Sequence, residues 1–404
     1  MQDETSSPLN AADSLSAQVA QLLQENRQIL SELQTVKEDL VGIRSFLAKK
    51  LAPVDKAIQD RIESMFQVQE RDNLTLWTTA STLKNIPSFI PREERPVGEN
   101  GVSTRFISFI NFKGGVGKTT LSANLTAAFA SGKYNLPGLA WGNPLRVLVV
   151  DTDFQGTLTD RCVEPFERMN LDKRRLTSAR LLTLPKHSNV TLKELRAPFI
   201  RCPNAWLIAA SDELDRADMK EQTRLALKTA DTRFFYRFWF HNEDFLKDYD
   251  LVIFDCPPRL TTSSVCALAV SDYAFIPTAP ESFDVHAVNR TVSFIIQLCW
   301  RLNLPLQIGG VIINRTAAST RLQPAEQEFV SKLQVFLNDL LGKDSEDSKS
   351  YVKKYGAPTI LKSFLPKKVG KKSINGDEGA PLPGADGSNE SLSDIASEIY
   401  ERIY

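Results

Sequence analysis

The stretch NFKGGVGKTT, residues 111–120, decides the fold. It ends like a phosphate-binding loop, whose general pattern is Gly, four residues, then Gly-Lys-Ser/Thr. Counting back from Gly117, the first glycine is expected at position 112, where Phe112 stands instead. A second lysine, Lys113, lies just inside the loop. The loop therefore departs from the common pattern at its start, and Lys113 is a candidate for an additional role.

The surroundings of this loop agree with phosphate binding. A β-rich run, FISFI, precedes it and a helical run, TTLSANLTAAFA, follows it. Consecutive glycines let backbone N–H groups turn inward around phosphate oxygens, and the helix N-terminus adds its dipole. We predict that Lys118 reaches the β- and γ-phosphates of ATP and that the Thr119 hydroxyl binds Mg²⁺. The predicted phosphate-binding residues are Gly114, Gly115, Val116, Gly117, Lys118, Thr119 and Thr120.

Three carboxylates follow two further apolar runs. VLVVDTDFQG (147–156) contains Asp151 and Asp153, and YDLVIFDCPP (249–258) contains Asp255. In an open parallel sheet the ligand lies beyond the carboxyl ends of the strands, so all three would point towards the loop. Asp255 has the position of the residue that holds Mg²⁺ and its waters. A single aspartate at a strand end is often a helix cap, but capping alone does not account for three.

Short β-rich runs alternate with helical stretches from residue 106 onward. This alternation predicts an α/β fold of the P-loop NTPase type: a mostly parallel twisted sheet with helices on both faces. The last helical spacing, Leu392 to Ile403, is expected to close the fold. The predicted strands are Phe106–Ile110, Val147–Val150, Leu251–Phe254, Ala274–Pro277 and Ile308–Ile313.

The N-terminal region has a different pattern. From Leu15 to Leu47 apolar residues recur in steps of four and three, which predicts an α-helical coiled coil. Asn26 at a core position and attractive charge pairs favour a parallel, in-register dimer; a tetramer and a helix packed on its own domain stay open. The predicted organisation is a disordered tail 1–11, a coiled-coil helix with a short second helix 12–66, a linker 67–104, and a globular domain 105–404 with a flexible loop 375–390.

The composition and charge of the chain exclude some classes of protein. The 404-residue chain has 49 basic and 49 acidic side chains, so no global field points to nucleic acid. The polar, acidic N-terminus does not resemble a secretory signal, and no apolar run approaches the roughly 20 residues of a membrane helix. Five cysteines lack paired or metal-binding spacing, which is typical of free thiols in a reducing cytoplasm. We expect a cytoplasmic protein, nucleoid-associated in a prokaryote, without a membrane partner.

KGGVGKTT, DTDFQG and YDLVIFDCPP, in this order, resemble the ParA/MinD family of deviant Walker A ATPases, and within it the ParA partition branch. The resemblance covers about 106–404. It implies that Lys113 crosses to the phosphates bound by the other subunit of an ATP-sandwich homodimer. It also implies that Asp153 orients the attacking water, that Asp151 lies near the Mg²⁺ shell, and that 255–264 is the switch II segment.

The resemblance implies further contacts and has departures. Asn314 would read adenine, and Pro366 would pack near the base. Phe154 stands where the family usually has proline, Phe112 stands where ParA proteins often have glutamine, and 160–206 aligns uncertainly. These departures leave nucleotide binding intact and affect the expected subgroup and partner.

The implied function is a dimerising switch that hydrolyses ATP slowly and binds DNA without sequence preference in its ATP state, for DNA segregation or cargo positioning. A protein partner that stimulates hydrolysis is also implied. Residues 349–372 carry eight lysines and no acid, interleaved with Tyr351 and Tyr355, and suit phosphate contacts; a solvated lysine-rich face is the alternative. The candidate DNA contacts are Lys353, Lys354, Lys367, Lys368, Lys371 and Lys372.

Three other functions compete. A membrane-positioning ATPase needs a basic amphipathic C-terminal helix, but Asp394, Glu398 and Glu401 make this helix acidic. An iron–sulfur reductase needs two cysteines per subunit; Cys256 and Cys266 lie in the right region without the partner motif. A regulatory or scaffold ATPase whose coiled coil recruits an effector stays open.

Overall fold

The computed structural model describes residues 87–134, 136–137, 139, 142–183, 190–226, 232–281, 284–317, 321–342, 346–366 and 390–404. All of them belong to the second of the two compact units of the chain, Leu76–Tyr404. The predicted tail 1–11, helices 12–66 and loop 375–390 lie outside the described residues. So do residues 67–86 of the predicted linker and four of the candidate DNA contacts, Lys367, Lys368, Lys371 and Lys372.

The described residues form one eight-stranded sheet with the order β3-β4-β2-β5-β1-β6-β7-β8. Every neighbouring pair is parallel except β3 and β4, which are antiparallel. The predicted α/β, mostly parallel fold is confirmed, and each of the five predicted runs is a strand. The strands are β1 (Arg105–Phe109), β2 (Val147–Asp151), β3 (Arg196–Pro198), β4 (Ala205–Ile208), β5 (Leu251–Asp255), β6 (Tyr273–Thr278), β7 (Gln307–Thr316) and β8 (Ile360–Pro366).

The three strands that the sequence did not predict are β3, β4 and β8. β3 and β8 are the edge strands of the sheet, and β4 lies between β3 and β2. Exposed and buried positions mix in β8, whereas every residue of β2, β5 and β6 is buried. A strand covered on both faces gives a continuous apolar run, and a short or half-exposed edge strand does not.

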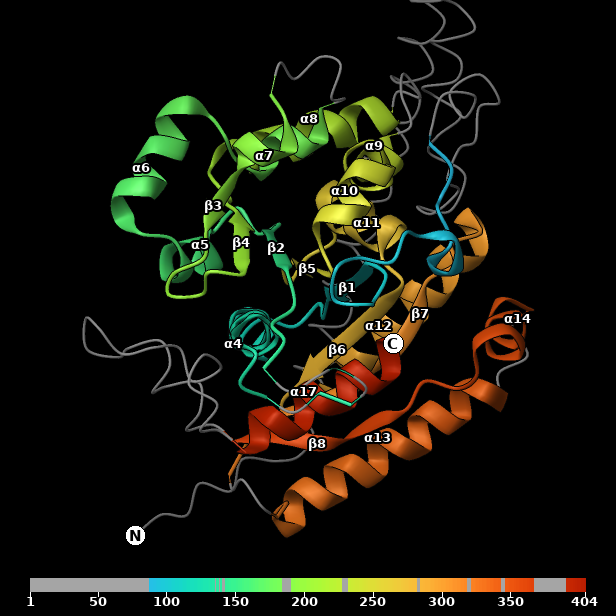
Figure 1. Ribbon diagram of the computed structural model, residues 1–404. Helices are drawn as coiled ribbons and strands as arrows, with labels where there is room; N and C mark the ends of the chain where they lie inside the picture. The colour runs from blue at the N-terminus through green and yellow to red at the C-terminus, as the bar shows by residue number, and fades with distance from the viewer. Residues whose placement is uncertain are drawn as a thin grey trace, which may run out of the picture. The chain divides into compact units, whose positions relative to one another are not determined.

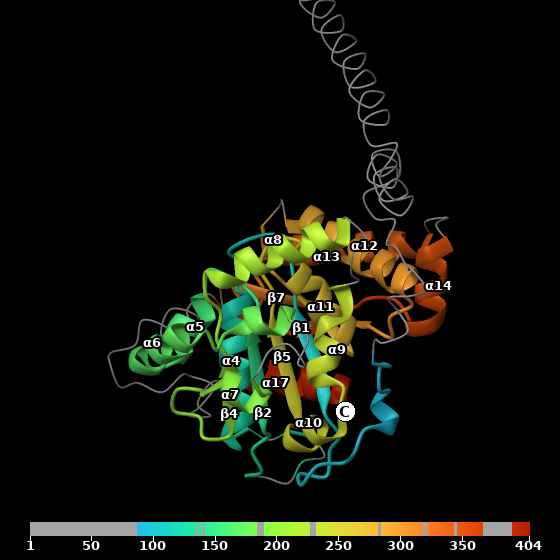
Figure 2. The ribbon, with the colours of Figure 1, turned by 90° about the horizontal axis from the view of Figure 1, so that it is seen from above.

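Helices cover both faces of the sheet. Figure 1 shows α4 and α17 on one side, with α11 and α12 on the other, and Figure 2 gives the view from above. The helices are α4 (Lys118–Ser131), α5 (Thr157–Cys162), α6 (Pro165–Arg174), α7 (Leu192–Leu195), α8 (Glu213–Ala226), α9 (Phe235–Phe240), α10 (Glu243–Asp248), α11 (Thr262–Val270), α12 (Asp284–Leu302), α13 (Pro324–Gly342), α14 (Glu346–Tyr355) and α17 (Glu390–Ile403). Short 3₁₀ turns are η2 (Arg92–Glu94), η3 (Ser178–Leu182) and η5 (Thr232–Phe234).

The C-terminal helix α17 closes the fold as predicted. Its apolar residues from Leu392 to Ile403 are buried, and Arg402 donates to the carbonyl of Gly309 in β7 at 2.7 Å. The apolar face of α17 is thus already covered by the domain, which disfavours a membrane-binding role for it. Within the described residues, no helix combines the length and the apolar character needed to cross a bilayer.

Residues 87–104, which the sequence groups with a linker, pack against the domain. Arg95 is buried and forms two hydrogen bonds with the carboxylate of Asp272, at 2.6 and 2.8 Å. Its guanidinium also lies 4.9 Å from the ring centre of Phe106 on β1. A buried charge needs such pairing, so this segment has a fixed place in the folded unit.

Candidate nucleotide-binding site

The carboxyl ends of the parallel strands gather the predicted site residues. The loop 111–117 follows β1, Asp151 ends β2, and Asp255 ends β5 directly opposite Asp151 in the strand register. Asn314 near the end of β7 pairs with Leu365 of β8, the residue before Pro366. The end of the sheet at which the carboxyl termini of the parallel strands lie therefore holds the loop, the carboxylates and both candidate base contacts.

The glycines shape the loop. Gly115 and Gly117 have left-handed φ angles of 75° and 89°. Gly117 is the N-cap of α4, and no side chain caps this helix. Because the first turn of a helix has N–H groups without intrahelical partners, these donors are available to an anion. This conformation suits the predicted phosphate-binding role of the loop, which stays a prediction.

Lys118 is a buried cation whose hydrogen bonds go to backbone carbonyls. Its side-chain ammonium donates to the carbonyls of Asn111 and Lys113, at 3.0 and 3.1 Å. Burial lowers its pKa, and the nearby carboxylates of Asp255 and Asp153 act in the opposite direction. Phosphate oxygens would bring negative charge into direct contact with this buried ammonium.

Phe112, which replaces the expected glycine, fastens the start of the loop to α12. Its N–H donates to the Thr291 hydroxyl at 3.3 Å. Its ring packs edge-on against Phe294 with 5.3 Å between ring centres. The substitution therefore provides packing against a neighbouring helix and leaves the glycines at 114, 115 and 117 in place.

Lys113 lies at the rim of the loop and is held within its own chain. Its ammonium contacts the carboxylate of Asp284, and that of Glu281 at 3.0 Å. The hydrogen bond to Asp284 is the main cause of a raised Lys113 pKa. Asp284 is fully buried and also accepts from the N–H of Ala279 at 3.1 Å. The lysine predicted to act on a second subunit is thus engaged in cis in the single chain.

Asp255 faces the loop and the start of α4. It accepts from Ser122 at 3.0 Å, and the Thr119 hydroxyl hydrogen-bonds the same carboxylate. Burial raises its pKa to about 6, against the effect of these hydrogen bonds. Thr119 and Asp255 are therefore adjacent oxygen donors, as Mg²⁺ prefers, and phosphate oxygens and water would complete its shell.

Asp151 organises the neighbouring loop. One carboxylate oxygen accepts from the N–H and hydroxyl of Thr159, at 3.0 and 2.7 Å, and the other accepts from the N–H of Asp153 at 3.1 Å. Burial, and then the charge of Asp255, raises its pKa to about 7. Its contacts position Asp153 and α5; its predicted place in the Mg²⁺ shell stays a prediction.

Asn314 braces the loop directly. Its amide donates to the carbonyl of Val116 at 2.9 Å, and the guanidinium of the next residue, Arg315, contacts the carbonyl of Gly115. Pro366 is buried at the end of β8. The adenine-reading roles of Asn314 and Pro366 stay predictions.

The sequence missed Asp284, Thr159 and Arg315 as members of this site. The only signal was their place: Arg315 follows Asn314, and Asp284 lies within the range 106–404 that resembles the family. The contacts of Asp284 and Arg315 join residues 171 and 200 positions apart, and such pairings depend on the crossovers of the sheet, which a single motif does not reveal. Thr159 is only 8 positions from its partner Asp151, but no motif marked it.

The predicted lysine-rich DNA segment is divided by β8. Lys353 and Lys354 are exposed at the end of α14, close to the amino end of β7, because the Gln307 side chain donates to the carbonyl of Tyr355 at 3.4 Å. From that end of the sheet, β8 runs about 20 Å to the end at which the carboxyl termini of the strands lie. Tyr351, one of the two tyrosines interleaved with these lysines, is buried, and its hydroxyl accepts from Ile308 N at 2.6 Å.

The comparisons with known proteins agree with this geometry. A family described as an AAA domain matches residues 104–308, half of the chain. The chromosome-partitioning ATPase Soj of Treponema pallidum is 30% identical over 237 residues, which cover 57% of this chain and 78% of Soj. The chain belongs to the ParA family of P-loop ATPases. Family members of this type bind and hydrolyse ATP.

Two further proteins show how much of each chain the similarity covers. An uncharacterized protein of Mycobacterium tuberculosis, MT1749, is 31% identical over 229 residues, or 57% of this chain and 63% of that protein. The chain thus spans less than two thirds of this relative. The structure of a Cyanothece McdA variant in complex with ATP shares the fold, with a TM-score of 0.52 and 17% identity over 74% of this chain and 97% of McdA.

The iron–sulfur alternative finds no support at the cysteines. Cys256 and Cys266 are both buried, neither is in a disulfide, and burial raises the pKa of Cys256 to about 12. A cluster shared between two subunits needs thiolates that reach the surface. Purified protein without colour would agree with this conclusion.

The raised pKa values predict pH-dependent binding of Mg²⁺–ATP. Asp255 and Asp151 titrate at about 6 and about 7, and a metal binds the deprotonated carboxylate. We expect the Mg²⁺-dependent gain in ATP affinity to shrink as the pH falls from 8 to 5.5. Titrations with Mg²⁺ and with a chelator at each pH isolate this gain from the titration of ATP itself. A gain that stays constant over this range would contradict the assignment.

Proposed function

We propose that this chain is an ATP-dependent, dimerising molecular switch of the ParA type. It would hydrolyse ATP slowly and bind DNA without sequence preference in its ATP state, for DNA segregation or cargo positioning. The observation that carries the proposal is the contrast between two lysines of one loop. Lys118 is buried and its ammonium binds backbone carbonyls of the loop, whereas the side chain of Lys113 is 30% exposed at the rim, where a second subunit could be reached.

The chain's residues divide the work as phosphoryl transfer requires, through positioning and charge compensation. Lys118 and the N–H groups of the loop would bind the phosphates. Thr119 and Asp255 would hold Mg²⁺, which neutralises phosphate charge when bound. Asp153 would orient the attacking water, and its N–H donates to the carboxylate of Asp151 at 3.1 Å.

Dimerisation would require Lys113 to exchange partners. In the single chain its ammonium is paired with Asp284 and Glu281. To act in trans it must leave these carboxylates for the phosphates bound by the second subunit. The cis ion pair therefore opposes closure of the dimer, and ATP in both subunits supplies the competing charge.

Asp284→Asn is expected to favour dimerisation. The amide keeps a hydrogen-bond acceptor for Ala279 N but removes the buried charge that holds Lys113. We expect the two ATPase domains to close on each other at a concentration of slowly hydrolysed ATP analogue about tenfold lower, measured as the rise in the sedimentation coefficient of the particle in analytical ultracentrifugation. Glu281→Gln is the matched control, because this exposed partner should contribute less. Weaker dimerisation of Asp284→Asn would show that the carboxylate supports the dimer.

The proposal predicts DNA binding that needs ATP and falls steeply with salt. Lys367, Lys368, Lys371 and Lys372 changed together to Glu should reduce DNA affinity at least about tenfold. Lys353→Glu with Lys354→Glu is the comparison, because these lysines lie at the other end of β8. Fluorescence anisotropy with a labelled duplex at several salt concentrations measures both. Unchanged affinity in the fourfold variant would remove this segment as the DNA site.

The proposal also covers the oligomeric state, the location and the protein partner of the chain. We propose a cytoplasmic, nucleoid-associated homodimer in which the coiled coil 12–66 holds two copies together before ATP is bound, with a tetramer as the alternative. A protein partner would stimulate hydrolysis. The same ultracentrifugation without nucleotide gives the number of chains per particle.

A further inference from the structure

A single side chain, Arg259, connects three elements beside the site. Its guanidinium carbon lies 4.4 Å from the centre of the Phe154 ring. The same guanidinium donates to the carboxylate of Asp215 at 2.6 Å. Phe154 directly follows Asp153, Arg259 lies four residues after Asp255, and Asp215 is in the first turn of α8. We call the set Phe154, Arg259 and Asp215 the clasp.

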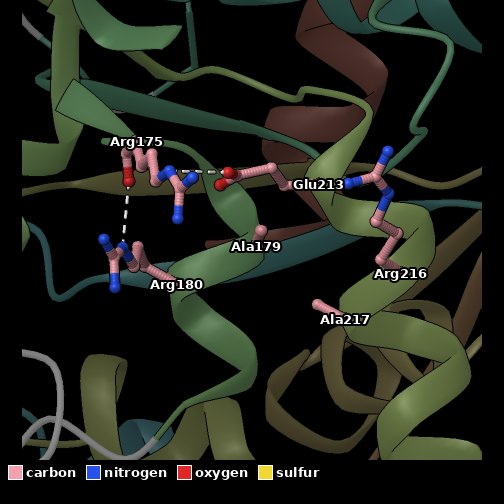
Figure 3. A pocket seen from close by; sticks show the side chains of 6 residues that line it. All are labelled: Arg175, Ala179, Arg180, Glu213, Arg216 and Ala217. Carbon is pink, nitrogen blue, oxygen red and sulfur yellow. Dashed lines mark hydrogen bonds and ion pairs between the residues drawn. The ribbon is translucent and has the colours of Figure 1, made fainter. Parts of the chain in front are cut away.

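The first turns of α8, which carry Asp215, are held in place by contacts that do not involve Arg259. Asp218, one turn further on, accepts from the N–H of Ser263 at 2.9 Å and from its hydroxyl at 3.1 Å, at the start of α11. On its other side α8 borders a hollow of about 290 Å³, where Glu213 pairs with Arg175 at 3.1 Å (Figure 3). Arg259 therefore joins the loop after β2 to a helix that is held independently of it.

The residue before Asp153 is bound to β5, since the Thr152 N–H and hydroxyl both donate to the carbonyl of Asp255, at 3.1 and 2.7 Å. From residue 153 onward the hydrogen bonds of the loop are local: Asp153 N donates to Asp151, and the Asp153 carboxylate and carbonyl accept from the N–H groups of Gln155 and Gly156, at 3.1 and 2.9 Å. The stack of the Arg259 guanidinium on the Phe154 ring fixes the direction of this part of the loop as well as its distance. Loss of the stack would give residues 153–156 more freedom relative to Asp255.

We propose that Arg259 is a positioning residue for ATP hydrolysis. Through Phe154 it locks the Asp153 loop to the segment after Asp255 and to α8, so that the carboxylates of Asp153 and Asp255 keep their positions relative to each other. This inference rests on the proposed function. The phosphate-binding loop between β1 and α4 is not part of the clasp, so nucleotide affinity should not depend on it.

If the pair of Arg259 and Asp215 only stabilised the surface of the fold, its removal would have different effects. The side chains of Arg259 and Asp215 are 47% and 37% exposed, and pairs of this exposure contribute little to stability. Their removal would leave the melting temperature, ATP affinity and turnover alike nearly unchanged. A positioning role instead predicts a loss in turnover number without loss of ATP affinity.

The test compares Arg259→Ala, Phe154→Ala and the double variant. We expect each single variant to lower the turnover number at least about tenfold, with the Kd for ATP within about twofold. The double variant should be no slower than the singles, because both break one contact chain. Arg259→Lys keeps the charge without the planar stack and should be intermediate. Arg175→Ala is the matched control, since it removes the Glu213 pair on the same helix.

Wild-type turnover in Arg259→Ala, a parallel rise in Kd, or additive losses in the double variant would overturn the proposal. Amide hydrogen exchange in the nucleotide-free protein separates this inference from the proposed function. We expect Arg259→Ala to speed exchange at Gln155 and Gly156, whose N–H groups bind Asp153. Unchanged exchange would refute the clasp even if the wild-type chain hydrolyses no ATP.

Discussion

Lys113→Ala is expected to lower ATP hydrolysis at least about a hundredfold while leaving the Kd for ATP within about twofold. A cation supplied by a second subunit contributes a factor of about 10³ to 10⁵ in comparable phosphoryl-transfer enzymes. The phosphate contact in cis is left intact, because Lys118 binds the backbone carbonyl of residue 113 and not its side chain. Phosphate release with and without DNA, and binding of a fluorescent ATP analogue, measure the two quantities.

A control is needed because the alanine variant leaves Asp284 buried and unpaired. The double variant Lys113→Ala/Asp284→Asn removes both charges, so its stability should recover while its hydrolysis stays low. Unaltered ATP-dependent dimerisation and hydrolysis in Lys113→Ala would defeat the trans mechanism. A large rise in Kd would instead place the side chain of Lys113 on the nucleotide of its own chain.

The sequence predicted those strands of the sheet whose residues are almost all buried. β1, β2, β5, β6 and β7 read as continuous apolar runs because both faces are covered by helices. β8 mixes buried, half-buried and exposed residues without a regular period and contains Lys362 and Ser363, so its pattern did not stand out. The antiparallel β3 has three residues, too few for any periodicity.

The site was predictable where the chemistry is local. The spacing of glycines and Lys118 defines the loop, and Asp255 ends an apolar strand. The cis partners of Lys113 were not predictable, because Lys113 and Asp284 are 171 positions apart and are brought together only by the strand order. The burial of Tyr351 was not predictable either, because tyrosine beside lysine is also typical of an exposed surface.

Gly117→Ala is expected to weaken ATP binding at least about tenfold. Gly117 has a φ of 89°, a conformation that costs a residue with a Cβ about 1–2 kcal/mol. The added Cβ would also lie 2.0 Å from the Asn314 side-chain nitrogen. Asn314 is buried and its nitrogen is bonded to the Val116 carbonyl, so it can yield only by releasing the loop. Calorimetric titration with Mg²⁺–ATP measures the loss.

Gly101→Ala separates the two causes. Gly101 has a φ of 75°, and an added Cβ there meets nothing within 4 Å, so this variant carries the backbone cost without the clash. It should lose stability and bind ATP like the wild type. Gly117→Ala/Asn314→Ala removes the clash but also the brace, and should recover part of the affinity that Gly117→Ala loses. Wild-type affinity in Gly117→Ala would mean that the loop does not hold phosphate in the conformation described, because neither the strain nor the contact could then be present in the bound state.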